Sequence, residues 1–331
     1  MLTPKENLAY FVYLHRTGLT VTALSFVLLI WPLLVTNPYH LGLSNLIAIH
    51  VLVVLGLNLF IGYTGQISLG HAAFFAIGAY GSAIGTVTFG LPAWPVLFLV
   101  ALAAAFIALA VGLPALNLRG HYLAMATLGF NVVIYTVLVQ WDTVTGGPSG
   151  FAGIPPLSIG AWVFDSELPI HYLVWTFATI FLLLSLNLVR SGVGRGLAAL
   201  SEDETAAAAL GVDIRKSKVK VFILSAVLAA LAGSLFAHCY AFVSPDSFNI
   251  FVSIDFVIMV VVGGMGSIWG TLFGAALITL LPEWIETLDT YKDMVHGLIL
   301  VVILLFLPQG FVTGLTEMVR TRIALKRGRH A

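Results

Sequence analysis

The fold of this chain depends on residues 62–71, which read Gly62-Tyr63-Thr64-Gly65-Gln66-Ile67-Ser68-Leu69-Gly70-His71. These glycines and polar side chains, the first glycine break, interrupt the apolar stretches near residues 41–61 and 67–89. The second glycine break, in the other half of the chain, reads Gly263-Gly264-Met265-Gly266-Ser267-Ile268-Trp269-Gly270. Paired breaks of this kind free backbone groups and half-helix ends that a polar solute could meet. Close packing of neighbouring helices is the alternative interpretation of the same glycines.

The composition around the breaks indicates a membrane protein. Of the 331 residues, 60% are hydrophobic and only 9% are charged. Soluble domains use about a quarter of their residues for charge, so this chain could not cover a water-facing surface. The same balance excludes a disordered chain, and a pI of about 7.1 argues against a nucleic-acid binder. We therefore predict an all-α polytopic membrane protein, because helices satisfy their own backbone groups in lipid.

Ten apolar stretches are candidates for crossing helices, near residues 19–36, 41–61, 67–89, 93–117, 121–141, 170–189, 219–241, 253–264, 267–282 and 294–313. A crossing helix needs about 20 mostly apolar residues, and the 253–264 stretch is short for one. Counting it as a crossing keeps the basic C-terminus on the inner side. The first stretch lacks a small-residue cleavage pattern, so it is interpreted as an uncleaved helix.

The positions of Lys and Arg predict the orientation, because positive residues favour the cytoplasmic side. With the N-terminus inside and ten alternating helices, Lys292 is the one basic residue of the 15 that falls on an outer segment. Both termini are then cytoplasmic. The sequence predicts one transmembrane domain over residues 1–331, with an external loop at 142–169, a cytoplasmic loop at 190–218 and a basic cytoplasmic tail at 314–331.

The cytoplasmic loop contains a predicted short helix with a defined start and end. Ser201 is a good N-cap, and acidic residues follow at 202–204, where the helix dipole favours anions. Strong helix formers occupy 206–210, and Gly211 is placed to end the helix. A basic run at 215–220 follows. A capped surface helix of this kind is expected of a docking element for a cytoplasmic partner.

Glu204-Thr205-Ala206-Ala207, followed by Leu210-Gly211, resembles the coupling-loop motif of ABC-importer permeases. Other stretches that resemble these permeases are Gly62–Tyr80, Leu118–Phe130, Thr145–Pro155, Gly194–His238, Phe256–Leu277 and Leu307–Gly310. Together they cover most of residues 60–312 and resemble the LivM-type permease subunits of branched-chain amino acid ABC transporters. The acidic run offers three carboxylates for the motif, and the spacing to Gly211 favours Glu204.

The resemblance implies a ten-helix permease of the type II, vitamin B12-importer-like architecture in a bacterial inner membrane. It implies pairing with a LivH-type permease, two cytoplasmic ABC ATPase subunits and an external substrate-binding protein. The residues expected to couple to the ATPases are Arg195, Glu202, Glu204, Ala207 and Gly211. The residues expected to meet the binding protein are Thr145, Gly146 and Gly147. The residues expected along the translocation path are Gly65, Gln66, Ser68, His71, Gly264, Gly266 and Ser267.

No enzymatic chemistry is predicted for the chain itself. The sequence contains no Gly-x-x-x-x-Gly-Lys-Ser/Thr, so ATP is expected to be used by the partner subunits and not by this chain. Its nine histidines include no i,i+3 or i,i+4 pair, and Cys239 is its single cysteine. We therefore predict no catalytic residues, no bound cofactor and no metal site.

Other functions and residue roles stay open at this point. Relatives of the family carry urea, short amides or other small compounds in place of branched-chain amino acids. An ion-coupled secondary transporter would need an ionisable relay, whereas the helix interiors offer His50, Asn58, His71 and Asn131. Asp255 is expected at the outer start of a helix rather than inside the membrane. His71 either packs and hydrogen-bonds or contacts substrate, and the first role is favoured.

Overall fold

A computed structural model describes residues 27–35, 37–118, 120–160 and 162–284, with residues 294, 297, 298 and 301. Within this part, five helices are long and apolar enough to cross a membrane. They are α2 (Pro38–Thr64), α4 (Ala93–Ala115), α5 (His121–Gln140), α7 (Glu167–Arg190) and α10 (Ile214–Tyr240). Residues 27–34 are helical too. The rest of the predicted first span, nearly all of the tenth span and the 314–331 tail lie outside the described residues.

Three shorter helices lie among the long ones: α3 (His71–Ala83), α11 (Ile250–Gly263) and α12 (Ile268–Trp284). α3 continues as one π-helical turn, η1 (Ile84–Thr88). The predicted 67–89 helix thus starts late, because the chain from Gly65 to Gly70 is not helical. α11 begins at Ile250 rather than at Asp255, so the prediction that Asp255 starts the helix is wrong.

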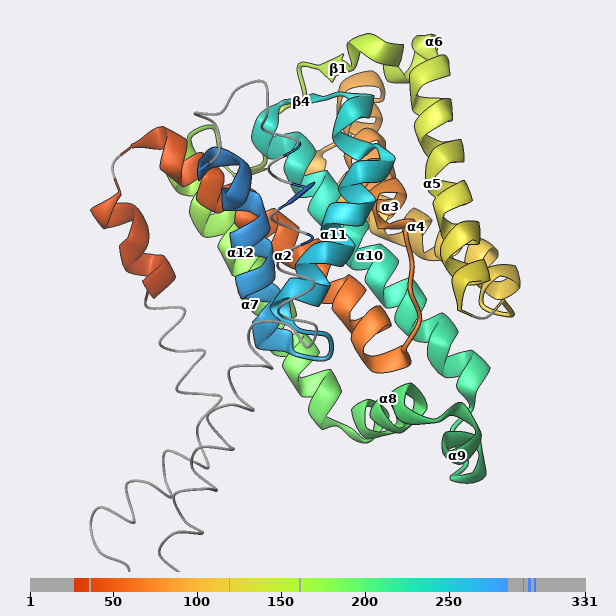
Figure 1. Cartoon of the computed structure of the whole chain (residues 1–331). Helices are drawn as coiled ribbons and strands as arrows, with labels where there is room; N and C mark the ends of the chain where they lie inside the picture. Colours follow the sequence, from red (N-terminus) through yellow and green to blue (C-terminus); the bar gives the residue numbers. More distant parts are fainter. Residues whose placement is uncertain are drawn as a thin grey trace, which may run out of the picture.

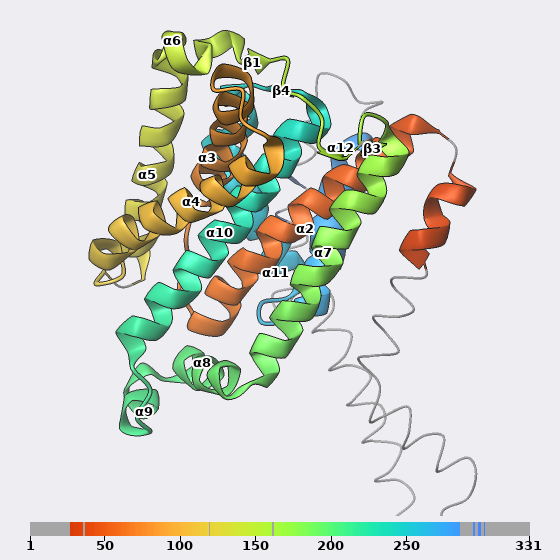
Figure 2. The same ribbon diagram turned by 180° about the vertical axis from the view of Figure 1, so that it is seen from behind.

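α2 and α10 form the centre of the bundle. Both are buried over most of their length, whereas α4, α5 and α7 are buried over a third of theirs or less. A helix that is apolar on all sides belongs in an interior. α7 lies along α2, and α4 packs against α10 (Figure 2). The outer helices turn large apolar side chains such as Phe98 and Phe106 outward, which suits a lipid environment.

Small residues allow α3 and α10 to pack with their backbones in contact. A methyl group on Gly78 would overlap the carbonyl oxygen of Ala230, and one on Gly233 would overlap that of Phe75. The hydroxyl groups of Ser82 and Ser234 join the same two helices with a hydrogen bond of 2.6 Å. Glycine, alanine and serine are the residues that permit such close contacts in membranes.

The two ends of the bundle differ in structure (Figure 1). One end carries α8 (Gly192–Glu202) and α9 (Glu204–Ala209), from the predicted 190–218 loop. The other carries the 142–169 segment, which folds into α6 (Asp142–Thr145), the 3₁₀ turn η2 (Gly147–Ser149), β1 (Phe151–Ala152) and the antiparallel hairpin of β2 (Ser158–Ile159) and β3 (Trp162–Val163).

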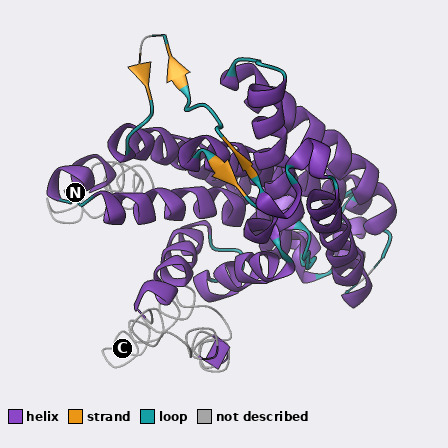
Figure 3. Cartoon of the chain, turned by 90° about the horizontal axis from the view of Figure 1, so that it is seen from above, coloured by secondary structure: helices purple, strands orange, loops and turns teal. Residues whose placement is uncertain are grey.

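β1 pairs antiparallel with β4 (Phe242–Val243), which is followed by the 3₁₀ turn η3 (Pro245–Phe248). Figure 3 looks onto this end and shows one strand pair over the helices and the other projecting past their edge.

The backbone contact between α3 and α10 predicts that Gly78→Ala destabilises the protein. We expect the free energy of unfolding to fall by about 1–3 kcal/mol, because the new methyl group meets backbone atoms that cannot move away without shifting a helix. The control is Gly129→Ala in α5, where no described atom lies within 4 Å of an added Cβ. That change should leave stability unaltered or raise it by up to about 1 kcal/mol. Thermal unfolding of the purified protein in detergent measures both, and equal midpoints would contradict the packing account.

Candidate functional site

The two glycine breaks, far apart in the sequence, lie against each other in the structure. A methyl group on Gly62, near the end of α2, would overlap the backbone nitrogen of Gly266. Asn58 binds the second break with both ends of its amide, since Oδ1 accepts from Gly266 N at 2.9 Å and Nδ2 donates to Ser267 O at 2.9 Å. The Tyr63 hydroxyl donates to Gly266 O at 2.5 Å. The structure thus brings the start of the first break, at Gly62 and Tyr63, against Gly266 of the second break.

Between α2 and α3, the first break is irregular backbone held by side chains of other helices. Gly65 ends α2 in the left-handed conformation, with φ at +66°. Farther along, Leu69 N donates to Thr127 Oγ1 of α5 at 3.0 Å. Ala72 N donates to Ser253 Oγ of α11 at 3.0 Å. An unpaired backbone group in hydrocarbon costs several kcal/mol, so these hydroxyls allow the helix to be interrupted here.

The predicted path residues differ in exposure. Gln66, Ser68, His71 and Gly264 are buried, whereas Gly65 is exposed and Gly266 and Ser267 are half-buried. The structure therefore places three polar side chains of the first break inside the protein.

His71 packs inside the bundle. Its Nε2 lies 3.0 Å from Ser225 Oγ of α10, and its ring contacts Phe60, Phe74 and Phe222. This environment favours the packing role over direct substrate contact. Within the described residues, no group of three or more His, Cys, Asp or Glu side chains is placed to hold a metal ion.

The 190–218 segment folds as two helices rather than the single one predicted. Ser201 is not the N-cap, because it lies in the last turn of α8 and its hydroxyl bonds to its own helix. Asp203 separates α8 from α9 and caps α9, its carboxylate accepting from Thr205 N at 2.7 Å. Asp and Ser are comparable as N-caps, so the sequence did not distinguish the two positions.

The residues predicted to couple to ATPases lie along α8 and α9. Ala207 is fully buried and Glu204 is half-buried, whereas Arg195 and Glu202 are exposed. Gly211 follows α9 with φ at +85°, a conformation that favours glycine. The helix therefore ends where the sequence predicted.

Glu204 joins α9 to the first glycine break and to α10. Its Oε1 accepts a hydrogen bond from Lys218 Nζ at 2.6 Å and a weaker one from Gln66 Nε2 at 3.4 Å. The Lys218 side chain is only 5% exposed and that of Glu204 is 34% exposed. A carboxylate on a surface helix is thereby connected to a buried amide in the first glycine break.

Sequence reasoning missed the role of Lys218 and of the side chains that hold the breaks. In the sequence, Lys218 counted only as one of the basic residues that set the orientation. It lies 14 residues from Glu204, a separation that matches no helix or strand period. Asn58 was noted only as an interior polar residue, although it bonds to Ser267 across 209 positions. Such long-range pairs leave no local signal in one sequence.

The cap of α9 is electrostatic in part. Hydrogen bonds from the Thr205 hydroxyl and from the backbone N–H groups of Ala206 and Thr205 hold the pKa of the Asp203 carboxyl below its usual 3.8. Because the pKa is lowered on folding, the stabilisation by the ionised cap is complete above pH ~4 and is lost as the pH falls through the folded value.

The residues predicted to meet the binding protein form a tight turn after α5. The buried Thr145 hydroxyl donates to Leu138 O at 2.7 Å. Gly146 and Gly147 have φ at +77° and +57°, and Gly147 is buried. These three residues therefore shape the turn, and the exposed side chains of Pro148 and Ser149 follow it on the surface.

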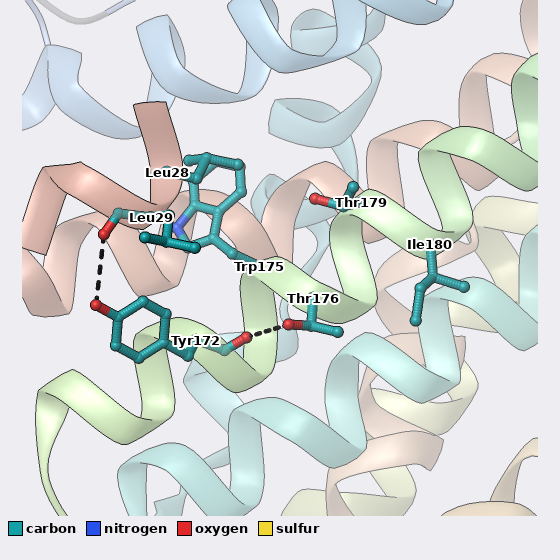
Figure 4. A pocket seen from close by; sticks show the side chains of 7 residues that line it. All are labelled: Leu28, Leu29, Tyr172, Trp175, Thr176, Thr179 and Ile180. Carbon is teal, nitrogen blue, oxygen red and sulfur yellow. Dashed lines mark hydrogen bonds between the residues drawn. The ribbon is translucent and has the colours of Figure 1, made fainter. Parts of the chain in front are cut away.

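An apolar groove lies at the edge of the bundle, between residues 27–34 and α7 (Figure 4). Its lining residues are Leu28, Leu29, Tyr172, Trp175, Thr176, Thr179 and Ile180. The Tyr172 hydroxyl donates to Leu29 O at 3.4 Å, and the Thr176 hydroxyl is used within its own helix. None of these residues belongs to either glycine break.

A helical bundle whose membrane helices are broken at buried polar segments defines the chain as a polytopic membrane permease. The family model for the permease component of the branched-chain amino acid transport system matches residues 39–304. The chain therefore belongs to this family of permeases. No solved structure matches it in the comparison.

Curated relatives agree with the family. The chain is 33% identical to the high-affinity branched-chain amino acid transport system permease protein LivM of Escherichia coli K12, over 95% of this chain and 78% of that protein. It is 27% identical to the corresponding protein BraD of Pseudomonas aeruginosa, over 80% of this chain and 91% of that protein. With LivH of Escherichia coli K12 it shares 25% identity over the same fractions, 80% and 91%.

The ion pair of Glu204 and Lys218 predicts that Glu204→Gln destabilises the protein. The change leaves the nearly buried ammonium group without a carboxylate, which we expect to cost about 1–3 kcal/mol for a pair that is partly open to water. Lys218→Met in the same chain should recover most of the loss. The control, Lys216→Met, removes the exposed pair with Asp213 and should cost less than about 1 kcal/mol. A loss no larger in Glu204→Gln than in the control would contradict this assignment.

The lowered pKa of Asp203 predicts that α9 frays in acid. Amide hydrogen exchange at Thr205 and Ala206 should accelerate as the pH falls below ~4, after correction for the intrinsic rate. Asp203→Asn keeps a capping oxygen but has no charge to lose, so its corrected exchange should not change with pH. Equal pH dependence in the two proteins would show that the carboxylate does not cap the helix.

Proposed function

We propose that this chain is the permease subunit of an ATP-driven importer for branched-chain amino acids. The observation that carries the proposal is the junction of Glu204 with Lys218 and Gln66, because it connects a surface helix suited to docking with a break inside the bundle. The substrate class is supported by the relatives, whose names give branched-chain amino acid transport.

In this proposal the work of the chain is conformational and ATP is hydrolysed by two partner subunits. Closure of the ATPases would press on α8 and α9 at the exposed Arg195, Glu202 and Gly211, with the half-buried Glu204 and the buried Ala207 transmitting the movement inward. Movement of Glu204 would pull on Gln66 in the first glycine break and on Lys218 in α10. Because α10 and α3 are in backbone contact, α3 would move with α10.

The translocation path is proposed to pass the junction of the two glycine breaks. The residues proposed to line the path are Gly65, Gln66, Ser68, His71, Gly264, Gly266 and Ser267. Two interrupted segments that meet inside a transporter commonly form the site at which access alternates. The direct contact of Gly62 with Gly266 supports this placement.

We propose that the α8 and α9 end faces the cytoplasm of a bacterium and that the chain lies in its inner membrane. Basic residues gather at that end, among them Arg190, Arg195, Arg215, Lys216 and Lys220, whereas the 142–169 end carries Asp142, Asp165 and Glu167. This asymmetry supports the orientation. Ten crossing helices, two cytoplasmic termini and the type II importer architecture complete the proposal.

The remaining partners are a LivH-type permease and an external substrate-binding protein. The binding protein is proposed to dock over the turn formed by Thr145, Gly146 and Gly147. Since Thr145 and Gly147 are buried, they would act by shaping the surface that the following residues present.

Uptake by the complete reconstituted transporter tests the proposal. Wild-type proteoliposomes should accumulate radiolabelled leucine only with ATP and binding protein. Glu204→Ala should lower leucine uptake per ATP hydrolysed at least tenfold, and more than Glu202→Ala does, because only Glu204 bonds to the first glycine break. The protein should still insert in the membrane. Leucine uptake that persists without ATP and stops when the proton gradient is collapsed would show an ion-coupled transporter instead.

A further inference from the structure

The Asn131 side chain is buried in the middle of α5 with its whole amide unpaired. It is 1% exposed, and neither Oδ1 nor Nδ2 has a hydrogen-bond partner among the residues that the structure describes. Other buried amides, such as those of Asn45, Asn58 and Gln66, make at least one hydrogen bond. A buried amide without partners lowers stability, so this one calls for an occupant that binds it.

Asn131 lies directly beyond the first glycine break. It is one helical turn from Thr127, the residue that binds Leu69 N, and residues four apart share one face of a helix. Gly70 permits this approach, because a methyl group there would press on the Thr127 carbonyl oxygen. The unpaired amide therefore continues the polar face of α5 along the proposed path.

Asn131 is also one of the residues that line a cavity of about 270 Å³ between α5 and the start of α11. Its lining residues are Asn131, Val132, Tyr135, Asn249, Ile250 and Phe251. The Asn249 side-chain oxygen is already used, because it accepts from Phe251 N at 2.9 Å and caps α11. The Tyr135 hydroxyl donates to Asp246 Oδ1 at 3.3 Å, which brings a carboxylate to the edge of the cavity.

We propose that Asn131 contacts the solute during translocation and that this cavity is a transient site for a small zwitterionic amino acid. The amide N–H groups donate to the carboxylate of the solute, and Oδ1 accepts from its ammonium group. The carboxylate of Asp246 adds attraction for the ammonium group, and Val132, Ile250 and Phe251 offer apolar contact to the side chain. This inference rests on the proposed transport function and adds a substrate-contacting residue to it.

Leucine uptake by the reconstituted complex tests the role of the amide. Asn131→Leu replaces the amide with an apolar side chain of similar size. Because no unpaired polar group is then buried, the thermal midpoint should stay the same or rise. The leucine uptake rate should fall at least tenfold, and Asn131→Ala should show the same loss. The matched control is Thr136→Val, an exposed position of α5 whose hydroxyl bonds to its own helix at 2.8 Å. This control should transport within twofold of wild type.

The outcomes separate three explanations. Stable, assembled Asn131→Leu complexes that do not transport support the proposal. Normal uptake by these complexes overturns it, and so does loss of the partner permease on purification, which would make Asn131 a subunit contact. If the wild-type complex itself takes up no leucine under ATP, the proposed function fails, and this inference fails with it.

Thiol labelling tests the site without measuring transport. The single native cysteine, Cys239, is replaced by serine, and Asn131→Cys is introduced. A charged methanethiosulfonate reagent reacts with the thiolate, which forms where water reaches. Position 131 is 1% exposed in this structure, so Cys at 131 should be labelled slowly at rest and at least threefold faster when leucine, binding protein and ATP drive the transport cycle. Leu138→Cys, on the same helix but packed in the core, should stay unlabelled. An unreactive Cys at 131, or a rate unaffected by leucine, would contradict the proposal.

Discussion

Backbone groups inside a membrane need partners within the protein, and this constraint determines how the interrupted helices are built. The chain breaks its helices at Gly65–Gly70 and Gly264–Ser267, where backbone N–H and C=O groups lose their helical bonds. Asn58, Tyr63, Thr127 and Ser253 supply partners from the side. Each of these side chains is far along the sequence from the backbone group that it binds. Interruption of the helices is therefore possible only in the assembled bundle.

Close packing is the second requirement, and it follows from the first. Side chains as short as Thr and Ser reach the broken backbone only if the helices approach closely. Gly62 and Gly70 provide that approach at the breaks, and Gly78 and Gly233 provide it between α3 and α10. The packing interpretation of these glycines is thus confirmed, and the solute path stays a prediction. Polar side chains stabilise the non-helical backbone of the breaks. Contacts between small residues hold the surrounding helices together.

The apolar lengths of α2, α4, α5, α7 and α10 were sufficient to predict those helices, because a membrane span requires about 20 apolar residues. The pattern did not separate Ser201 from Asp203 as a cap, since both residue types accept the same backbone bonds. It missed the late start of α3, which depends on hydroxyls from α5 and α11. The bond of Glu204 to Lys218 and the clamp of Asn58 on the second glycine break were also beyond reach, because tertiary contacts of this kind have no period in sequence. Composition decides which segments enter the membrane, and tertiary contacts decide where they break.

We propose that Glu204 passes force from α9 to the first glycine break through Gln66. A double-mutant cycle measures this link directly, with Gln66→Ala, Glu204→Ala and both changes compared in leucine taken up per ATP hydrolysed. If the two side chains act as one unit, the double variant should lose no more coupling than Glu204→Ala alone. Losses that multiply, as for two independent sites, would show that Glu204 does not act through Gln66.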